Sequence, residues 1–179
     1  MLTIHTADAL APGGESPSLP GGAVLVEGRE IAAVGSHEEL TAAHPTARVR
    51  RWPGVITPGL LNPDGPELLE RSYHPDPRED LGSEPLTGEA LTALGMTDAR
   101  WGASARRGVQ RLLAQGTVAV AGPLRRPAVI DAVHRSGLRI EQGVTPMPLR
   151  PGADATFAIF DATECVATVI RGRLLHRCR

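Results

Sequence analysis

The sequence predicts an α/β protein with short β-hairpins near both ends of the chain and a βαβαβ unit in the middle. Two observations support this fold class, one from the termini and one from the middle of the chain. Short apolar runs near both termini are joined by Gly-containing pairs, which are typical of β-hairpins. Between them, β-rich runs alternate with two helical patterns. Aromatic residues make up only 3% of the chain, so Val, Leu, Ile and Ala must build the core.

Composition limits the classes of function. With 179 residues, 41% of them hydrophobic, the chain can form one good-sized core or two small ones. The formal net charge is -1 and the charges are scattered, so we expect no nucleic-acid partner. We interpret the arginine pairs at 50–51, 106–107 and 125–126 as solvated surface, with an anion site as the alternative. Two cysteines favour a reducing compartment, and no apolar run approaches the roughly 20 residues of a membrane span, so we expect a soluble, cytoplasmic protein.

The N-terminal third has the pattern of a small sheet. We expect a strand at residues 2–4, a Gly/Pro/Ser-rich loop at 13–22, and a hairpin of 23–27 with 30–35. Ser36 followed by Glu39 is a capping box, which predicts a short helix ending before Pro45. His37 and His44 lie on or beside this helix, where we expect them to be exposed. Residues 48–52 alternate polar and apolar side chains, as a strand with one buried face does.

The middle of the chain alternates strands and helices. We expect strands at 55–61, 117–121 and 138–141, and helices at about 98–115 and 127–136, which together form a right-handed βαβαβ unit. Residues 62–97 contain five prolines, and we expect them to be mostly loop with one short helix after Thr87. His134 falls on the second helix, where we expect it to be half-buried.

The C-terminal part returns to a β pattern. Residues 166–170 and 173–176 form a predicted hairpin around Arg171 and Gly172. The chain thus has two β-rich ends, 1–54 and 145–179, and an α/β part at 55–144 with a Pro-rich loop at 62–97.

Several motifs resemble the amidohydrolase superfamily, and imidazolonepropionase in particular. The segment Val55-Ile-Thr-Pro-Gly-Leu-Leu61 is similar to the first barrel strand of that family, which ends in a His-x-His metal pair. Similar matches are Ile-Ala-Ala-Val-Gly at 31–35, Ser-Gly-Leu-Arg at 136–139, and the return motif that runs from Thr145 through Pro-Gly-Ala-Asp at 151–154 to Asp161, with Thr156 where the family usually has Asp. This resemblance implies that residues 1–54 and 145–179 form one composite β-domain, a small β-sandwich built from both termini. It also implies that the α/β domain at 55–144 is a truncated remnant of an amidohydrolase barrel, because a closed (β/α)8 barrel needs about 250 residues.

The resemblance also implies a degenerate metal site. Asn62, Pro63 and Asp64 stand where the family has His-x-His. Two imidazoles one residue apart on a strand point to the same side and bind one zinc ion, whereas a carboxamide and one carboxylate bind it poorly. The missing barrel strands supply, in the family, the remaining metal ligands and the catalytic Asp. We therefore expect no cofactor, with a divalent metal such as zinc as the alternative.

The resemblance and the missing metal ligands lead to two functional hypotheses. In the first, the protein is a binding or assembly domain without metal-dependent hydrolase activity, whose small polar ligand contacts Asn62, Asp64 and His74. In the second, it is a hydrolase of non-peptide carbon–nitrogen bonds with a rebuilt site, in which Asp64, His74 and His134 act as ligands or bases. A cluster of His74, Asp76, Glu79 and Asp80 is a further possible chelating group, although solvated surface is the preferred interpretation.

The truncated barrel leads us to expect an interaction partner. A three-stranded parallel unit exposes a strand edge, so we expect a homodimer or a partner protein to cover it. An accessory subunit of another enzyme is a third functional hypothesis.

Overall fold

The computed structural model describes residues 1–142 and 147–178. Contacts divide this part of the chain into two compact units. The β-unit contains residues 1–60, 113–118 and 147–178, and the α/β-unit contains residues 61–112 and 119–142. The predicted domain boundary at 144/145 and the start of the return motif at Thr145 lie outside the described residues.

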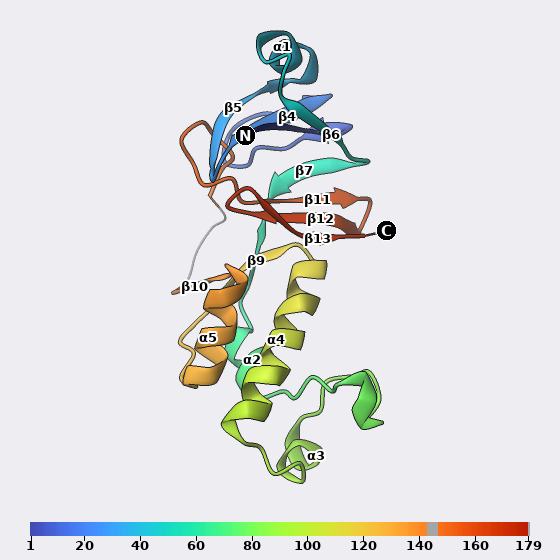
Figure 1. Ribbon diagram of the computed structural model, residues 1–179, viewed down its shortest axis with the longest axis vertical. Coiled ribbons are helices and arrows are strands. Elements are labelled where there is room, and N and C mark those ends of the chain that lie inside the picture. The colour runs from blue at the N-terminus through green and yellow to red at the C-terminus, as the bar shows by residue number, and fades with distance from the viewer. Residues whose placement is uncertain (143–146, 179) are drawn as a thin grey trace. The chain divides into compact units, whose positions relative to one another are not determined.

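The first sheet of the β-unit has four strands in the order β5-β4-β1-β6, namely Glu30–Ser36, Gly22–Glu27, Leu2–Thr6 and Arg48–Arg51 (Figure 1). β4 pairs antiparallel with β1 and β5, whereas β6 runs parallel to β1. The hairpin predicted for residues 23–35 is confirmed, and Gly28 at its turn has a φ of 62°.

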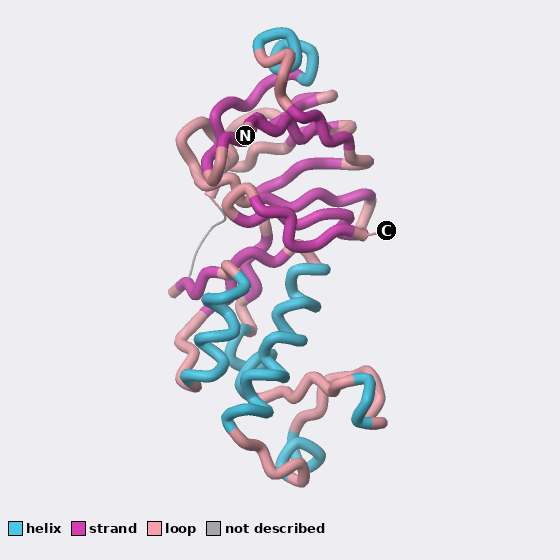
Figure 2. The backbone as a smooth tube through the Cα atoms, in the orientation of Figure 1, coloured by secondary structure: helices cyan, strands magenta, loops and turns pink. Residues whose placement is uncertain are grey.

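The second sheet of the β-unit joins both ends of the chain. Its six strands follow the order β13-β12-β11-β7-β2-β3, namely Arg173–Arg177, Glu164–Ile170, Phe157–Asp161, Val55–Pro58, Ala9–Leu10 and Leu19–Pro20. The N-terminal half meets the C-terminal part where β7 pairs antiparallel with β11. Figure 2 shows these strands in magenta. The composite β-sandwich expected from the two termini is therefore confirmed.

Alternation along β4 separates two apolar cores. Val24 and Val26 pack into the larger cluster, which draws Phe157, Ile159 and Val169 from the six-stranded sheet. Ala23 and Leu25 point the other way, toward Leu40 of helix α1 (His37–Ala43). β4 is buried on both faces, so it lacks the alternation of polar and apolar residues that a strand with one exposed face shows. This explains the continuous apolar run of β4.

The capping box of α1 is confirmed. The Ser36 hydroxyl oxygen accepts a hydrogen bond from the Glu39 backbone N–H at 3.2 Å, and the Glu39 carboxylate accepts one from the Ser36 N–H at 3.3 Å. These two bonds satisfy donors that a helix N-terminus otherwise leaves without partners.

The α/β-unit contains the helical segments other than α1 and most of a three-stranded sheet. The sheet order is β10-β9-β8, namely Arg139–Glu141, Thr117–Ala121 and Leu60–Asn62, and β10 runs parallel to β9. The helical segments are α2 (Gly65–Glu70), the 3-10 turn η1 (Pro77–Glu79), α3 (Gly88–Thr92), α4 (Asp98–Ala114) and α5 (Pro127–Ser136). Residues 1–142 and 147–178 form no closed barrel. The predicted α/β class is confirmed, as are α4, α5 and β9.

The prediction of a single strand at residues 55–61 is wrong. This segment forms two strands, β7 and β8, which belong to different sheets and are separated at Gly59. A Cβ atom at Gly59 would lie 2.3 Å from the Val118 side chain, so only glycine allows this close approach. The proline before it has no N–H to continue a ladder.

Two further expectations need correction. Residues 65–70, which we predicted as loop, form α2, and its Leu69 is fully buried. A Cβ at Gly65 would lie 2.3 Å from the Ala121 carbonyl oxygen, so α2 begins directly against β9, a contact that no local pattern reveals.

His134 is exposed on α5 rather than half-buried. None of the described helices combines the length and the hydropathy that a membrane crossing requires.

Candidate functional site

Asn62 and Asp64 lie where β8 ends and α2 begins. The Asn62 side-chain oxygen accepts a hydrogen bond from the Asp64 backbone N–H at 2.9 Å, which is an Asx turn. Asp64 is the N-cap residue of α2, and its side chain is exposed. The carboxamide oxygen of Asn62 therefore stabilises the entry into the helix.

His74 is buried, with only 3% of its surface exposed. Its Nε2 lies 2.8 Å from the Leu68 carbonyl oxygen. Because a carbonyl only accepts, Nε2 carries the hydrogen and Nδ1 keeps a lone pair, which has no partner among the described residues. Burial lowers the pKa of His74, so the ring is neutral at pH 7. The neutral ring is locked in one tautomer by its contact with the main chain.

The three predicted ligand residues do not make a metal centre. Within residues 1–142 and 147–178, His74 forms no hydrogen bond or ion pair with Asn62 or Asp64. No group of three or more His, Cys, Asp or Glu side chains in that part of the chain is placed to hold a metal ion. The zinc site that the resemblance implies therefore does not fit the residues present, because Asn62 is engaged in its turn and no imidazole stands beside it.

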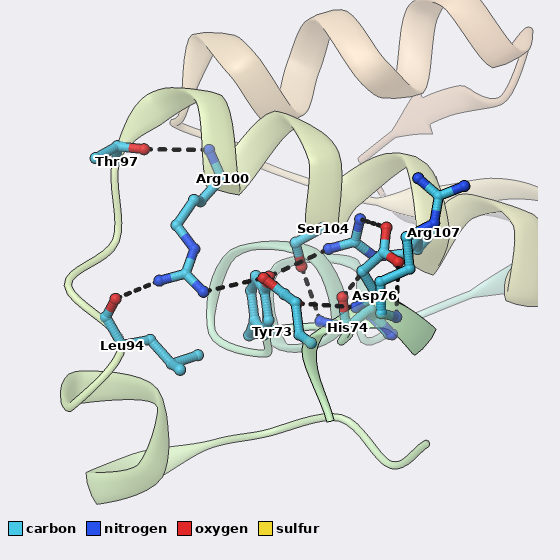
Figure 3. Close-up of polar contacts among 10 residues, drawn as sticks. Tyr73, His74, Asp76, Leu94, Thr97, Arg100, Ser104 and Arg107 are labelled. Atoms are coloured by element: carbon cyan, nitrogen blue, oxygen red, sulfur yellow. Dashed lines mark hydrogen bonds and ion pairs between the residues drawn. The ribbon is translucent and has the colours of Figure 1, made fainter. Parts of the chain in front are cut away.

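Tyr73 is the centre of a polar network between the 73–79 segment and α4 (Figure 3). Its hydroxyl donates to the Glu79 carboxylate, with oxygen–oxygen distances of 2.7 and 2.6 Å. Arg100 pairs with the same carboxylate at 3.1 Å, and the Arg107 guanidinium donates to the Tyr73 hydroxyl at 3.3 Å. Both guanidinium groups also lie over the Tyr73 ring, at 5.2 and 5.6 Å from its centre.

This network holds Glu79 ionised. The hydrogen bond from Tyr73, followed by the one from the Asp76 N–H and by Arg100, lowers the pKa of Glu79 to about 2. Burial and the neighbouring Glu79 raise the pKa of Tyr73, which therefore remains a donor at neutral pH. Asp76 caps η1 by accepting from the Arg78 N–H at 3.0 Å and lies 3.5 Å from Arg107. Two of the carboxylates that we considered as chelating groups, Asp76 and Glu79, thus face arginines and backbone donors.

Replacing Tyr73 with phenylalanine should raise the pKa of Glu79 from about 2 toward its ordinary value of 4.5, because the largest stabiliser of the carboxylate is removed. NMR titration of the side-chain carboxyl carbon measures this change. Glu39 provides an internal control, since Ser36 alone lowers its pKa, and its titration should not move. An unchanged Glu79 titration would contradict the role of the Tyr73 hydroxyl.

Sequence reasoning missed Arg100 and interpreted Arg107, with Arg106, as solvated surface, so it did not find the contact of either arginine with Tyr73. Arg100 and Arg107 are seven residues apart on a helix that was predicted correctly, so they lie two turns apart on one face. That spacing was the available signal. Their partner Tyr73 lies in a Pro-rich segment without periodicity, and nothing local pairs it with α4.

A groove of about 620 Å³ lies in the α/β-unit between α4, α5 and the start of the 75–79 segment. Its polar lining includes four arginines and one carboxylate: Arg106, Arg107, Arg111, Arg135 and Asp76. Arg107 is held there because its Nε donates to the His74 carbonyl oxygen at 2.7 Å.

His5 is a second residue that sequence reasoning missed. It lies on β1 in the β-unit, with 2% of its surface exposed. Its Nδ1 accepts a hydrogen bond from the Trp52 indole N–H at 3.3 Å, and its ring contacts the Phe157 ring edge to face at 5.1 Å. Burial, with a contribution from Arg50, lowers the pKa of His5 to about 4. The ring is therefore a neutral part of the core.

Comparisons with known proteins agree with this architecture. Residues 22–47 match the model of the bacterial imidazolonepropionase-like composite domain, a segment that contains β4, β5 and α1. No curated protein sequence matches the chain.

Solved structures share the fold. Ochratoxinase from A. niger aligns with 82% of this chain at 22% identity and a TM-score of 0.51. An adenosine deaminase from Xanthomonas campestris with bound zinc aligns with 77% at 17% identity and a TM-score of 0.52, and molinate hydrolase aligns with 78% at 20% identity and 0.52. The chain covers only 30%, 32% and 29% of these proteins, respectively. At these low sequence identities the similarity shows a shared fold alone.

Proposed function

We propose that this chain, which is amidohydrolase-like and carries an imidazolonepropionase-like composite domain, is a binding or assembly domain that works without metal-dependent hydrolysis. The observation that carries this proposal is the use of Asn62, the first position at which the resemblance places a metal ligand. Its carboxamide oxygen accepts a hydrogen bond from the Asp64 backbone N–H in an Asx turn, so it serves the fold. Asp64 occupies the N-cap position of α2, where its exposed carboxylate makes no capping hydrogen bond and has no imidazole beside it among the described residues.

The alternative is a hydrolase acting on carbon–nitrogen bonds. The names of the structural neighbours favour it, since they include hydrolases and deaminases. Such chemistry requires an activated water and a positioned acid or base. The described residues supply no converging group of that kind, because His74 is buried against the Leu68 carbonyl and His134 is exposed on α5.

Assembly is supported by the open three-stranded sheet. Its order leaves β8 and β10 as the outer strands, and an outer strand presents backbone donors and acceptors that another chain can pair with. We propose that a second copy or a partner protein covers an edge of this sheet.

Metal analysis of the purified protein tests the proposal. After incubation with zinc and manganese followed by desalting, we expect substoichiometric metal, because no described ligand set holds either ion. Asp64→Asn should leave the metal content unchanged, as should Asp98→Asn, a control at an exposed carboxylate in the first turn of α4. Stoichiometric metal that is lost in Asp64→Asn but kept in Asp98→Asn would overturn the proposal in favour of the hydrolase.

Light scattering of the same preparation tests assembly. At micromolar concentration we expect a mass above the 18.9 kDa of one chain. A monomer under these conditions would contradict self-assembly, whatever the metal result.

A further inference from the structure

We infer that the arginine-lined groove between α4 and α5 binds a small, multiply charged organic oxyanion. The groove has a volume of about 620 Å³, which is within the range of small-molecule sites. All its lining residues belong to the α/β-unit, and neither Asn62 nor Asp64 is among them. The inference therefore goes beyond the proposed function and does not depend on whether the chain hydrolyses anything.

Positive charge in this groove exceeds negative charge. Arg106, Arg107 and Arg111 lie within little more than one turn of α4, and Arg135, which pairs with Asp131 at 2.8 Å, lines the groove from α5. Asp76 is the single carboxylate of the lining. In the described part of the chain, no carboxylate lies within 4.0 Å of Arg106 or Arg111. Like charges gathered in one concave surface raise the local potential and attract an anion.

One of these arginines is preorganised. The Arg107 Nε donates to the His74 carbonyl oxygen at 2.7 Å, its terminal nitrogens contact Asp76 and Tyr73, and its side chain is only 25% exposed. A guanidinium held in this way loses little conformational entropy when an anion binds nearby. Arg106 and Arg111 are exposed, and the Arg111 guanidinium donates to the Ser83 carbonyl oxygen.

The floor of the groove indicates the rest of the ligand. Val109 is buried at its base, and Ala103 and Ala132 line it from the two helices. An anion with a small apolar body fits such a surface, while guanidinium forks pair with phosphate or carboxylate oxygens. No aromatic side chain occurs among the described lining residues, so the groove lacks the stacking platform that single-stranded nucleic acid uses.

Isothermal titration calorimetry with inorganic pyrophosphate and with citrate tests this inference at about 0.1 M salt, where screening is moderate. We expect the native protein to bind at least one of them. The double variant Arg106→Gln/Arg111→Gln should bind that probe at least roughly tenfold more weakly, because two charge-assisted contacts are lost. Tighter pyrophosphate binding would assign phosphorylated ligands, and tighter citrate binding would assign carboxylates; both results support the site.

Arg125→Gln is the matched control. Arg125 is exposed in the same unit but does not line the groove, so this variant should bind within about twofold of the native protein. Circular dichroism verifies that each variant is folded. Absence of binding at millimolar probe, equal weakening in Arg125→Gln, or tighter binding of a single-stranded oligonucleotide than of either probe would each overturn the inference.

Discussion

Gly54→Ala is expected to lower the free energy of unfolding by about 2–6 kcal/mol, the sum of left-handed backbone strain and overpacking. Gly54 lies between β6 and β7 with a φ of 77°. A Cβ added there would lie 2.0 Å from the Phe160 carbonyl oxygen and 2.7 Å from the Asp161 Cα. Those atoms belong to β11, which is paired on both sides, so the backbone cannot move away without breaking the sheet.

Gly21→Ala separates the two contributions. Gly21 also has a positive φ, of 59°, but a Cβ there would meet no atom within 4 Å. This variant should lose only about 1–2 kcal/mol, from the backbone conformation alone. Urea denaturation followed by circular dichroism measures both variants. Equal losses would show that the close approach of Gly54 to β11 is not what limits the site.

Lowering the pH from 6.5 to 4 should cost the fold about 3 kcal/mol through His5 alone. In the unfolded chain His5 titrates near 6.5, whereas in the fold its pKa is about 4. Between these values the unfolded state binds the proton and the folded state does not. Protonation therefore favours unfolding, and the stabilising contribution is complete above pH 6.5 and lost as the pH falls toward 4.

His5→Phe tests this linkage. Phenylalanine keeps a flat apolar ring against Phe157 but has no proton to bind, so the variant should lose the His5 part of the pH dependence. Its stability at neutral pH should also drop, because the Trp52 indole N–H loses its acceptor. The quantity to compare is the difference in unfolding free energy between pH 6.5 and 4, measured by urea denaturation. His134→Gln is the control, since His134 is exposed. The same pH slope in native protein and His5→Phe would contradict the assignment.

The local elements could be predicted because their causes are local. The Ser36–Glu39 capping box, the hairpin around Gly28 and the helices at 98–114 and 127–136 all depend on residues within a few positions of one another. The pairing of both termini in one sheet was predicted through the resemblance to the amidohydrolase superfamily. That resemblance also identified Asn62 and Asp64 as the positions where a metal pair is expected.

The candidate sites were harder to predict from the sequence than the local elements. The sequence placed His74 in a predicted pocket for a small polar ligand and, in the alternative, among metal ligands or bases. In the structure its ring nitrogen contacts the Leu68 carbonyl, and its main chain contacts Ser104 and Arg107 on α4. Clustering along the chain predicted an acidic group at 74–80. In three dimensions Glu79 and Asp76 face arginines that lie more than 20 positions further along.

By itself, the sequence determined the fold class, the α4–β9–α5 succession, and the presence of Asn62-Pro63-Asp64 where the resemblance leads one to expect a His-x-His pair. Only the tertiary structure decided that the 55–61 run divides between two sheets, that His5 is a neutral core residue, and that four arginines share one groove. The physical reason is the range of the contacts. Hydrogen-bond periodicity and capping act within a few residues, whereas the approach of Gly59 to Val118, or of Arg107 to His74, joins segments that are far apart in the chain.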